Sequence, residues 1–446
     1  MRRPPVSGLL ALAATVPGVV VALTGLELPA PVAAVVYGGA IVGAAFVLAW
    51  AAEAAQVDVS AGLAVAVLAL IAVLPEYSVD FVFTWQGGAD TREYGAACAP
   101  PGGDGTPACS LALANMTGAN RILVGLGWVL VVLIAWRRGG RRGIRLGCAD
   151  AVPLAFLTIA SLYCLILPFK RTLTLWDTAV LVAVFVAYSW RVSRAPAGEP
   201  ELIGPSAWIG GLGRAPRRAV VIGLFVVAAA VILLAAEPFA ESLVDTGEDL
   251  GISQFLLVQW VAPLASEAPE LLVAGLYAWR LHTTEALGAL VSSKVNQWTL
   301  LVGTLPVVFA ASSHGWSGLP IAAAQRGELL LTAAQSLLAI ALLLGLTLSL
   351  RAALMLLGLF LVQFVLGALI PPRWHDEELV TLSVVYLALA VVALVRKRDC
   401  LVPMLRDGLL ARHDQLGDDL LCTTTGGGRL RLRTRLRAVM PTHPPV

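Results

Sequence analysis

The chain has 446 residues, of which 58% are hydrophobic and only 13% are charged, and its mean hydropathy is +0.82. Such a composition excludes an ordinary soluble domain and indicates a protein that crosses a membrane many times. The formal net charge of +2 conceals an uneven distribution of basic residues along the chain, which bears on topology.

Apolar stretches long enough to cross a bilayer as helices, about 17 to 25 residues each, recur along the chain. About twelve can be placed, at residues 8–25, 30–54, 60–85, 111–136, 148–168, 173–190, 217–239, 250–279, 283–311, 328–350, 352–370 and 378–396. The sequence therefore predicts an all-α, polytopic membrane protein.

Lysine and arginine accumulate on the cytoplasmic side of membrane proteins, which gives an independent test of this topology. With the amino terminus inside, the cytoplasmic segments hold the run RRGGRRGIR (137–145), the linker 191–216 and a tail that follows RKR at 396. The acidic loop ESLVDTGED (241–249) falls on the opposite side, and Lys170 and Arg171 are the exception. Both termini are thus predicted to be cytoplasmic, in a multi-pass protein of the cell membrane.

Six cysteines are too few for a disulfide scaffold. Cys98 and Cys109 bracket the polar segment APPGGDGTPA, which the topology places outside. Two alternatives remain open: the pair closes the loop as a disulfide in an oxidising compartment, or both are free thiols.

The tail 401–446 is too polar to be a span. Its first half has a loosely amphipathic helical pattern, and its second half alternates as RLRLRTRLR. We expect a solvated or membrane-surface tail whose arginines contact anionic lipid, and no nucleic-acid partner.

An internal repeat is visible between the third and eighth spans. VLALIAVLPEYSVDFVF places Pro75 and Glu76 within the third span, and VQWVAPLASEAPELLVAGLY places Pro269 and Glu270 likewise in the eighth. The span that follows each of them carries TGANRILVG (117–125) or SKVNQWTLLVG (293–303). The third and eighth spans cross in opposite directions, so the repeat is inverted, as in many transporters.

This repeat divides the chain into two halves of about five helices each. We predict a peripheral first helix (1–29), a first repeat (30–190), a cytoplasmic linker (191–216), a second repeat (217–370), a last helix (371–400) and the tail (401–446).

A glutamate at the centre of a bilayer is costly unless it is protonated, paired or bound to an ion. A proline within a span also frees a backbone carbonyl. Two facing Pro-Glu sites would offer the all-oxygen shell that calcium and sodium prefer. Helical spacing places Ser266 and Glu267 on the same face as Glu270, and Ser292 on the same face as Asn296.

These residues resemble the cation/calcium antiporter superfamily of the sodium/calcium exchanger type, which has two inverted repeats with a Gly-Thr-Ser-x-Pro-Glu-like motif and a Gly-Ser-Asn-x-x-Asn-like motif. ALASEAPEL through VSSKVNQWTLLVG carries the more specific match. The resemblance implies a set of ion ligands at Glu76, Glu270, Ser266, Ser292, Asn120 and Asn296, to which Glu267 adds an acid.

The sequence departs from the family pattern at several positions. Ala72 and Val73 replace two hydroxyl residues before Pro75, and Met116 replaces a serine. Asp80 lies near a helix end, where solvent can reach it. Arg121 and Lys294 lie deep in their spans and need a partner or a wet cavity; Lys294 either points away from the site or pairs with Glu267.

The leading hypothesis is a secondary antiporter that alternately exposes a midplane carboxylate site to the two sides of the membrane. Its transported cations are substrates, and no cofactor is expected. Sodium/calcium, sodium/proton and calcium/proton exchange remain alternatives. An embedded enzyme is disfavoured because no nucleophile and base pair, no HExxH motif and no His/Cys cluster appears, and a channel does not need paired inverted carboxylates.

Overall fold

The computed structural model describes residues 6–58, 74–99, 106–194, 202, 204–411, 424–425 and 429–430. In this part of the chain, 11 helices are long and apolar enough to cross a membrane. Helix α4 (Leu74–Tyr94) covers the second half of the predicted third span, whose first half, together with Ala72 and Val73, lies outside the described residues. The all-α, multi-spanning class is confirmed.

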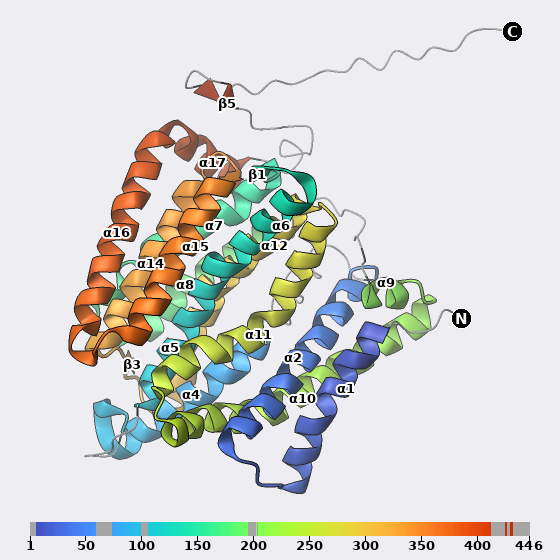
Figure 1. Ribbon diagram of the computed structural model, residues 1–446, viewed down its shortest axis with the longest axis vertical. Helices are drawn as coiled ribbons and strands as arrows, with labels where there is room; N and C mark the ends of the chain where they lie inside the picture. Colours follow the sequence, from blue (N-terminus) through green and yellow to red (C-terminus); the bar gives the residue numbers. More distant parts are fainter. Residues whose placement is uncertain are drawn as a thin grey trace, which may run out of the picture.

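Four helices form a group at one side of the molecule, drawn in blue and green in Figure 1. They are α1 (Val6–Thr24), α2 (Ala30–Ala55), the short α9 (Pro205–Gly210) and the long α10 (Arg214–Leu250). α10 packs along α2, and α1 covers both. A hydrophobic cluster centred on buried Ala40, Ile41 and Phe239 joins this group to α4 and to α11 (Gln254–Trp279).

The remaining helices form the larger body. Those of the first half are α4, α5 (Ala108–Ile122), η2 (Leu123–Trp128), α6 (Val129–Gly139), α7 (Ala151–Cys164) and α8 (Leu175–Val192). Those of the second half are α11, α12 (Thr283–Asn296), η5 (Gln297–Leu301), α13 (Val302–Ser313), α14 (Ala323–Leu343), α15 (Leu350–Leu369) and α16 (His375–Arg396). The short helices are η1 (Gly95–Ala97), η3 (Cys148–Asp150), η4 (Leu167–Phe169) and η6 (Pro372–Trp374).

The two halves repeat each other in local detail. In each half a π-helical segment, η2 or η5, follows the asparagine of the repeat, so that α5 continues into α6 and α12 into α13. α7 contacts α12, and its counterpart α14 contacts α5; α8 contacts α13, and its counterpart α15 contacts α6. Each helix of one half therefore contacts the other half as its counterpart does, which a two-fold relation between the halves requires.

Short antiparallel strand pairs join the halves at both ends of the molecule. β1 (Gly143–Arg145) pairs with β4 (Thr347–Ser349), with Ile144 opposite Leu348. β2 (Thr172–Leu173) pairs with β3 (Leu319–Pro320). Figure 1 shows β1 at the upper end of the molecule and β3 at the lower end. A third pair, β5 (Thr424–Thr425) with β6 (Arg429–Leu430), belongs to the tail.

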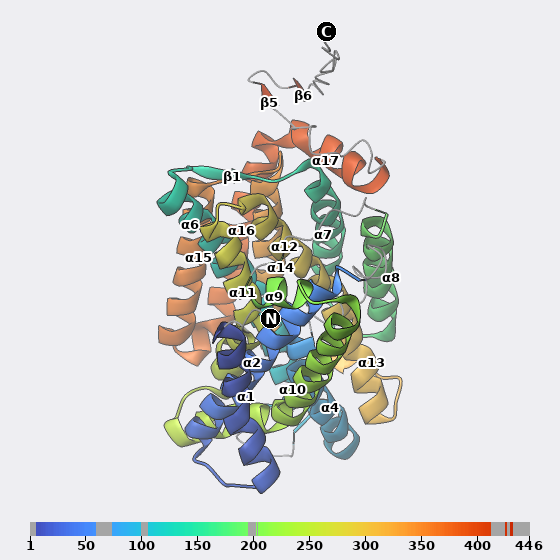
Figure 2. The same cartoon turned by 90° about the vertical axis from the view of Figure 1, so that its right-hand side faces the viewer.

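Two of the segments that the sequence assigns to the same side lie at the same end of the molecule. Figures 1 and 2 place α17 (Arg398–Leu410) and β1, with its basic run, at the same upper end. Cys98 and Cys109 are joined by a disulfide, which decides between the two alternatives for this loop. The exceptional Lys170 is neutralised by the buried Asp177, whose carboxylate lies 2.5 Å from its ammonium.

The first part of the predicted surface tail is a packed helix. Gly408 of α17 lies directly against the backbone of Ala151 in α7, and Arg191 of α8 donates hydrogen bonds to the carbonyls of Gly408 and Ala411. This part of the tail is thus attached to the helical body, because its apolar face finds a partner there. Most of the arginine-rich remainder lies outside the described residues.

Candidate functional site

Three glutamates from the two repeats meet inside the molecule. Glu76 lies in the first described turn of α4, and Glu267 and Glu270 lie on α11. One carboxylate oxygen of each lies within 4.8 Å of those of the other two. Glu76 and Glu267 are buried, and Glu270 is partly buried. The structure thus brings both repeated glutamates together and adds the unrepeated Glu267 between them.

Prolines shape the helix that carries two of these acids. Pro263 and Pro269 lie inside α11, which remains helical from Gln254 to Trp279. A proline cannot donate to the carbonyl four residues earlier, so Pro263 leaves the carbonyl of Gln259 without its usual helical partner. That carbonyl points at Gly118 of α5, where an added Cβ would lie only 1.7 Å from the oxygen. Close contact between α5 and α11 therefore depends on this proline and this glycine.

Two side chains next to the predicted ligands hold the carboxylates. The Ser293 hydroxyl donates to Glu270 Oε2 at 2.7 Å. The Gln297 amide donates to Glu76 Oε1 at 3.2 Å and to Glu267 Oε1. The two residues are four apart and share one face of the helix. Sequence reasoning missed both, although their spacing and their position beside Ser292 and Asn296 were a readable signal.

The other predicted ligands of the second repeat have different surroundings. The Ser266 hydroxyl is bonded to the carbonyl of Pro263 at 3.2 Å. Asn296 is buried, and its Oδ1 has no hydrogen-bond partner among the described residues. The Ser292 hydroxyl lies beside Tyr188 of α8. It is therefore Ser293, and not the predicted Ser292, that reaches the carboxylate cluster, because one residue along a helix turns the side chain by about 100°.

Lys294 occupies the oxygens of the first repeat's asparagine. Its ammonium donates to the backbone carbonyl and to Oδ1 of Asn120, both at 2.7 Å, and it lies 5.1 Å from the Trp298 ring. Within the described part of the chain no ion pair joins Lys294 to Glu267, so the pairing considered from the sequence is not found. The lysine instead engages a predicted cation ligand with its own positive charge.

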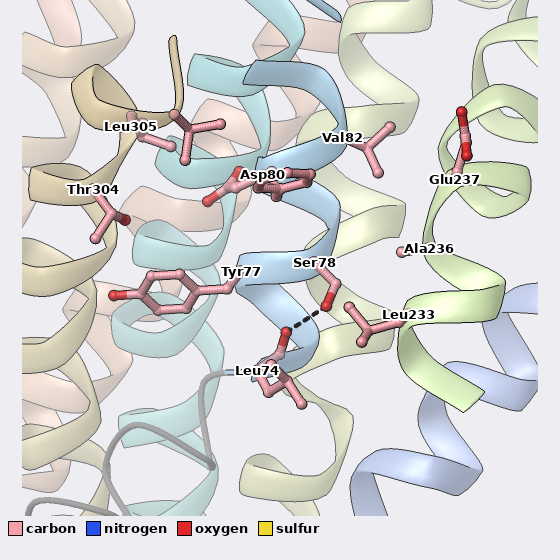
Figure 3. A pocket seen from close by; sticks show the side chains of 12 residues that line it. Leu74, Tyr77, Ser78, Asp80, Val82, Leu233, Ala236, Glu237, Thr304 and Leu305 are labelled. Atoms are coloured by element: carbon pink, nitrogen blue, oxygen red, sulfur yellow. Dashed lines mark hydrogen bonds between the residues drawn. The ribbon is translucent and has the colours of Figure 1, made fainter. Parts of the chain in front are cut away.

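Asp80 is buried, contrary to the solvated position expected from the sequence. Its Oδ1 accepts a hydrogen bond from Asn115 of α5 at 2.7 Å, and its Oδ2 has no partner among the described residues. Asp80 lines a cavity of about 470 Å³ between α4, α10 and α13. Figure 3 shows Tyr77 and Asp80 on α4 and Thr304 on α13 at one side of this cavity, and Glu237 on α10 at the other.

Comparisons with known proteins agree with this architecture. The family model described as "Sodium/calcium exchanger protein" matches residues 30–193 and 220–369. The crystal structure of the H+/Ca2+ exchanger CAX has 37% sequence identity and a TM-score of 0.83, over 92% of this chain and 98% of that chain. The structure of native YfkE has 15% identity and a TM-score of 0.60, over 81% of this chain and 99% of that chain, and supports the fold alone. Among curated proteins, none matches this chain.

The matched ranges cover most of the chain and include all three glutamates of the cluster. They also include both asparagine helices and the π-helical segments that follow them. Cations are consequently the substrates, no cofactor is required, and the protein is not an enzyme. The chain belongs to the sodium/calcium exchanger family and is a cation/calcium antiporter of the membrane.

Proposed function

We propose that this antiporter exchanges calcium for protons at a single site formed by Glu76, Glu267 and Glu270. The observation that carries the proposal is the cluster itself, in which three carboxylates from the two inverted repeats lie within 4.8 Å of one another. Calcium is bound by carboxylate-rich oxygen shells. Three like charges so close together and away from water require a bound cation or bound protons.

The neutral side chains around the cluster leave carboxylate oxygens available to bind a divalent ion. Ser293 and Gln297 hold one oxygen each of Glu270, Glu76 and Glu267, which leaves Glu76 Oε2 and Glu267 Oε2 without hydrogen-bond partners among the described residues. These free oxygens are the expected ligands. When calcium leaves, protons on the same carboxylates can replace its charge, which is the basis of exchange at one site.

The cavity beside Asp80 is the proposed access route from one side. It lies next to Glu76 along α4, one turn toward the end that bears the disulfide. Its walls hold the carboxylates of Asp80 and Glu237, which favour cations. Alternating access then requires α10 and α4 to close this cavity while a path opens toward the opposite end.

Exchange for sodium is the second candidate, supported by the description of the family model. Lys294 already places a positive charge on the two oxygens of Asn120, where an additional monovalent cation would otherwise bind. We therefore place calcium/proton exchange first, in agreement with the 37% identity to the H+/Ca2+ exchanger CAX.

Uptake of labelled calcium into proteoliposomes, under an imposed proton or sodium gradient, tests the proposal. We expect a proton gradient to drive uptake and a sodium gradient alone to fail. Glu76→Gln, Glu267→Gln and Glu270→Gln should each abolish uptake, whereas Glu285→Gln, an exposed acid at the start of α12, should not. Parent-like uptake by the three cluster variants would show that the carboxylates are not the site.

Lys294→Met tests why sodium is disfavoured. Removing the ammonium frees the oxygens of Asn120, so we expect sodium to begin to compete with calcium uptake in this variant. Lys294→Arg keeps the charge and serves as the matched control. Unchanged ion selectivity in a folded Lys294→Met protein would mean that the lysine does not take the place of a cation.

A further inference from the structure

A second group of buried charges lies away from the three glutamates. Arg121 of α5 forms an ion pair with Glu328 of α14. The other oxygen of Glu328 lies 3.5 Å from His375 Nε2, and His375 Nδ1 lies 3.1 Å from Glu378 Oε2. The side chains of Arg121, Glu328 and Glu378 are 1%, 3% and 2% exposed. His375 is 24% exposed and is the first residue of α16, so it is the most accessible member of the group.

The geometry around the imidazole favours one additional bound proton. A neutral imidazole has one donor nitrogen and one acceptor nitrogen, whereas an imidazolium has two donors. Both ring nitrogens of His375 face carboxylate oxygens, which are acceptors when ionised. An additional proton, on His375 or on one of the carboxylates, provides a donor for each of the two contacts.

The charge balance of the group also indicates one additional proton. With Arg121 paired to Glu328, the remaining carboxylate of Glu378 leaves one negative charge among buried side chains. An unbalanced buried charge is costly, and one proton on the His375–Glu378 pair removes it. The charged groups facing His375 are Glu328 from α14 and Glu378 from α16, with Arg121 behind Glu328, while α15 approaches with the uncharged Gly367.

The position of the group connects a membrane edge to the central site. His375 begins α16, at the lower end of the molecule in Figure 1, the end that also holds β3. Arg121 follows Asn120, whose oxygens bind Lys294, and its guanidinium also lies 5.4 Å from the Trp260 ring of α11. These contacts connect His375, through Glu328 and Arg121, to the helix that carries Asn120.

We propose that His375, Glu328 and Glu378 form a second proton-binding site, separate from the three transport glutamates, that exchanges its proton with the solution at the α16 end and modulates transport through Arg121. The proton bound here is a regulatory ligand and is not carried across the membrane. Its binding is independent of the proposed calcium/proton exchange, while its effect on transport rests on that proposed function.

Histidine-selective NMR of the full chain in lipid nanodiscs tests proton binding directly, without any ion gradient. The chain has five histidines, and loss of a signal in His375→Gln assigns the resonance. We expect His375 to titrate, and its midpoint to change by about one pH unit in Glu378→Gln. Glu377→Gln, an exposed acid on the same turn, is the matched control. Equal midpoints in the parent and Glu378→Gln would overturn the proposal.

Calcium uptake as a function of the pH on the α16 side tests the regulatory role. His375→Gln should lose one inflection of the pH profile, and His375→Lys, which fixes a positive charge, should hold the rate found at acidic pH. His314→Gln, an exposed histidine at the end of α13, should keep the parent profile. A parent profile in His375→Gln would refute modulation, whereas absence of uptake in every protein would refute only the proposed exchange.

Discussion

Gln297 is the residue on which the carboxylate cluster depends most directly. Its amide donates one N–H to each of two glutamates from opposite repeats, Glu76 and Glu267, and its own Oε1 has no hydrogen-bond partner among the described residues. A neutral amide can bridge two carboxylates only because it carries two donors on one nitrogen. It therefore holds α4 and α11 together while its own oxygen has no hydrogen-bond partner among the described residues.

Gln297→Leu should weaken calcium binding by at least about tenfold, because hydrogen bonds to charged groups contribute about 1.5 to 3 kcal/mol each. The apparent affinity in the uptake assay measures the change. Gln335→Leu is the matched control, since Gln335 is also fully buried and neither of its amide atoms has a partner among the described residues. Equal affinities in the two variants would mean that the bridge has no part in binding.

At the scale of helices, the contact between α5 and α11 sets how close the two repeats can approach. The carbonyl oxygen of Gln259 lies so close to Gly118 that no side chain could be placed at this position. This contact fixes the position of Asn120 on α5, one half-turn along the helix, relative to the glutamates on α11. A small residue at such a crossing is typical of packed membrane helices.

Gly118→Ala should separate α5 from α11, with a loss of about 2 kcal/mol of stability, as is usual for overpacked sites, and a loss of transport. Thermal unfolding of the purified protein in detergent measures the first effect. Gly223→Ala on α10, where an added Cβ meets no atom within 4 Å, is the control and should melt at or slightly above the parent temperature. A parent-like melting curve for Gly118→Ala would show that the crossing has room to adjust.

A second contact between elements ties the end of α2 to the start of α10. Asp58 follows α2 and accepts hydrogen bonds from Arg217 at 2.7 and 2.9 Å. Arg218 and Arg214 lie 3.5 and 3.8 Å from the same carboxylate. The hydrogen bond from Arg217, with the charges of the neighbouring arginines, holds the pKa of Asp58 below its ordinary value of 3.8.

Because this pKa is depressed in the folded protein, the stabilisation is present above pH 3.8 and is lost as the pH falls through the folded value. Asp58→Asn should therefore lower the melting temperature at pH 7, and the difference from the parent should disappear in strong acid. Asp399→Asn, which removes an exposed acid 3.9 Å from Arg398, should change little at either pH. A pH-independent difference for Asp58→Asn would exclude the ion pair as its cause.

For the molecule as a whole, we propose that the upper end in Figure 1, with the basic run around β1 and the helix α17, faces the cytoplasm. The disulfide between Cys98 and Cys109 lies in a connection of the opposite end, where an oxidising compartment would allow it to form. Contact of the arginine-rich tail with anionic lipid stays a prediction.

Thiol labelling with a membrane-impermeant reagent measures this orientation. Both test positions, Ser317 and Arg398, are exposed. In a protein that also carries Cys422→Ser, Ser317→Cys should be labelled in intact cells. Arg398→Cys should be labelled only after the membrane has been permeabilised. The remaining free cysteines in the described residues, Cys148, Cys164 and Cys400, are buried and should contribute little background. The reverse labelling pattern would invert the topology.

The sequence by itself determined the class of protein and the inverted repeat. Apolar spans and the sides on which arginines accumulate are local properties of the chain, and Pro75-Glu76 and Pro269-Glu270 are local motifs, so each could be read without knowledge of packing. For the same reason Glu76, Glu267 and Glu270 could be singled out, since an acid within an apolar span is conspicuous wherever it points.

Only the tertiary structure decided which polar side chains meet. Ser293 rather than Ser292 reaches Glu270, Lys294 turns to Asn120 rather than to Glu267, and Arg121 finds Glu328 more than 200 residues away in the chain. The rotation of a helix about its axis is set by its packing against neighbouring helices, and a change of one residue turns a side chain by about 100°. Composition and spacing do not specify that rotation. Only the folded structure therefore shows which polar side chains contact the glutamates and asparagines of the site.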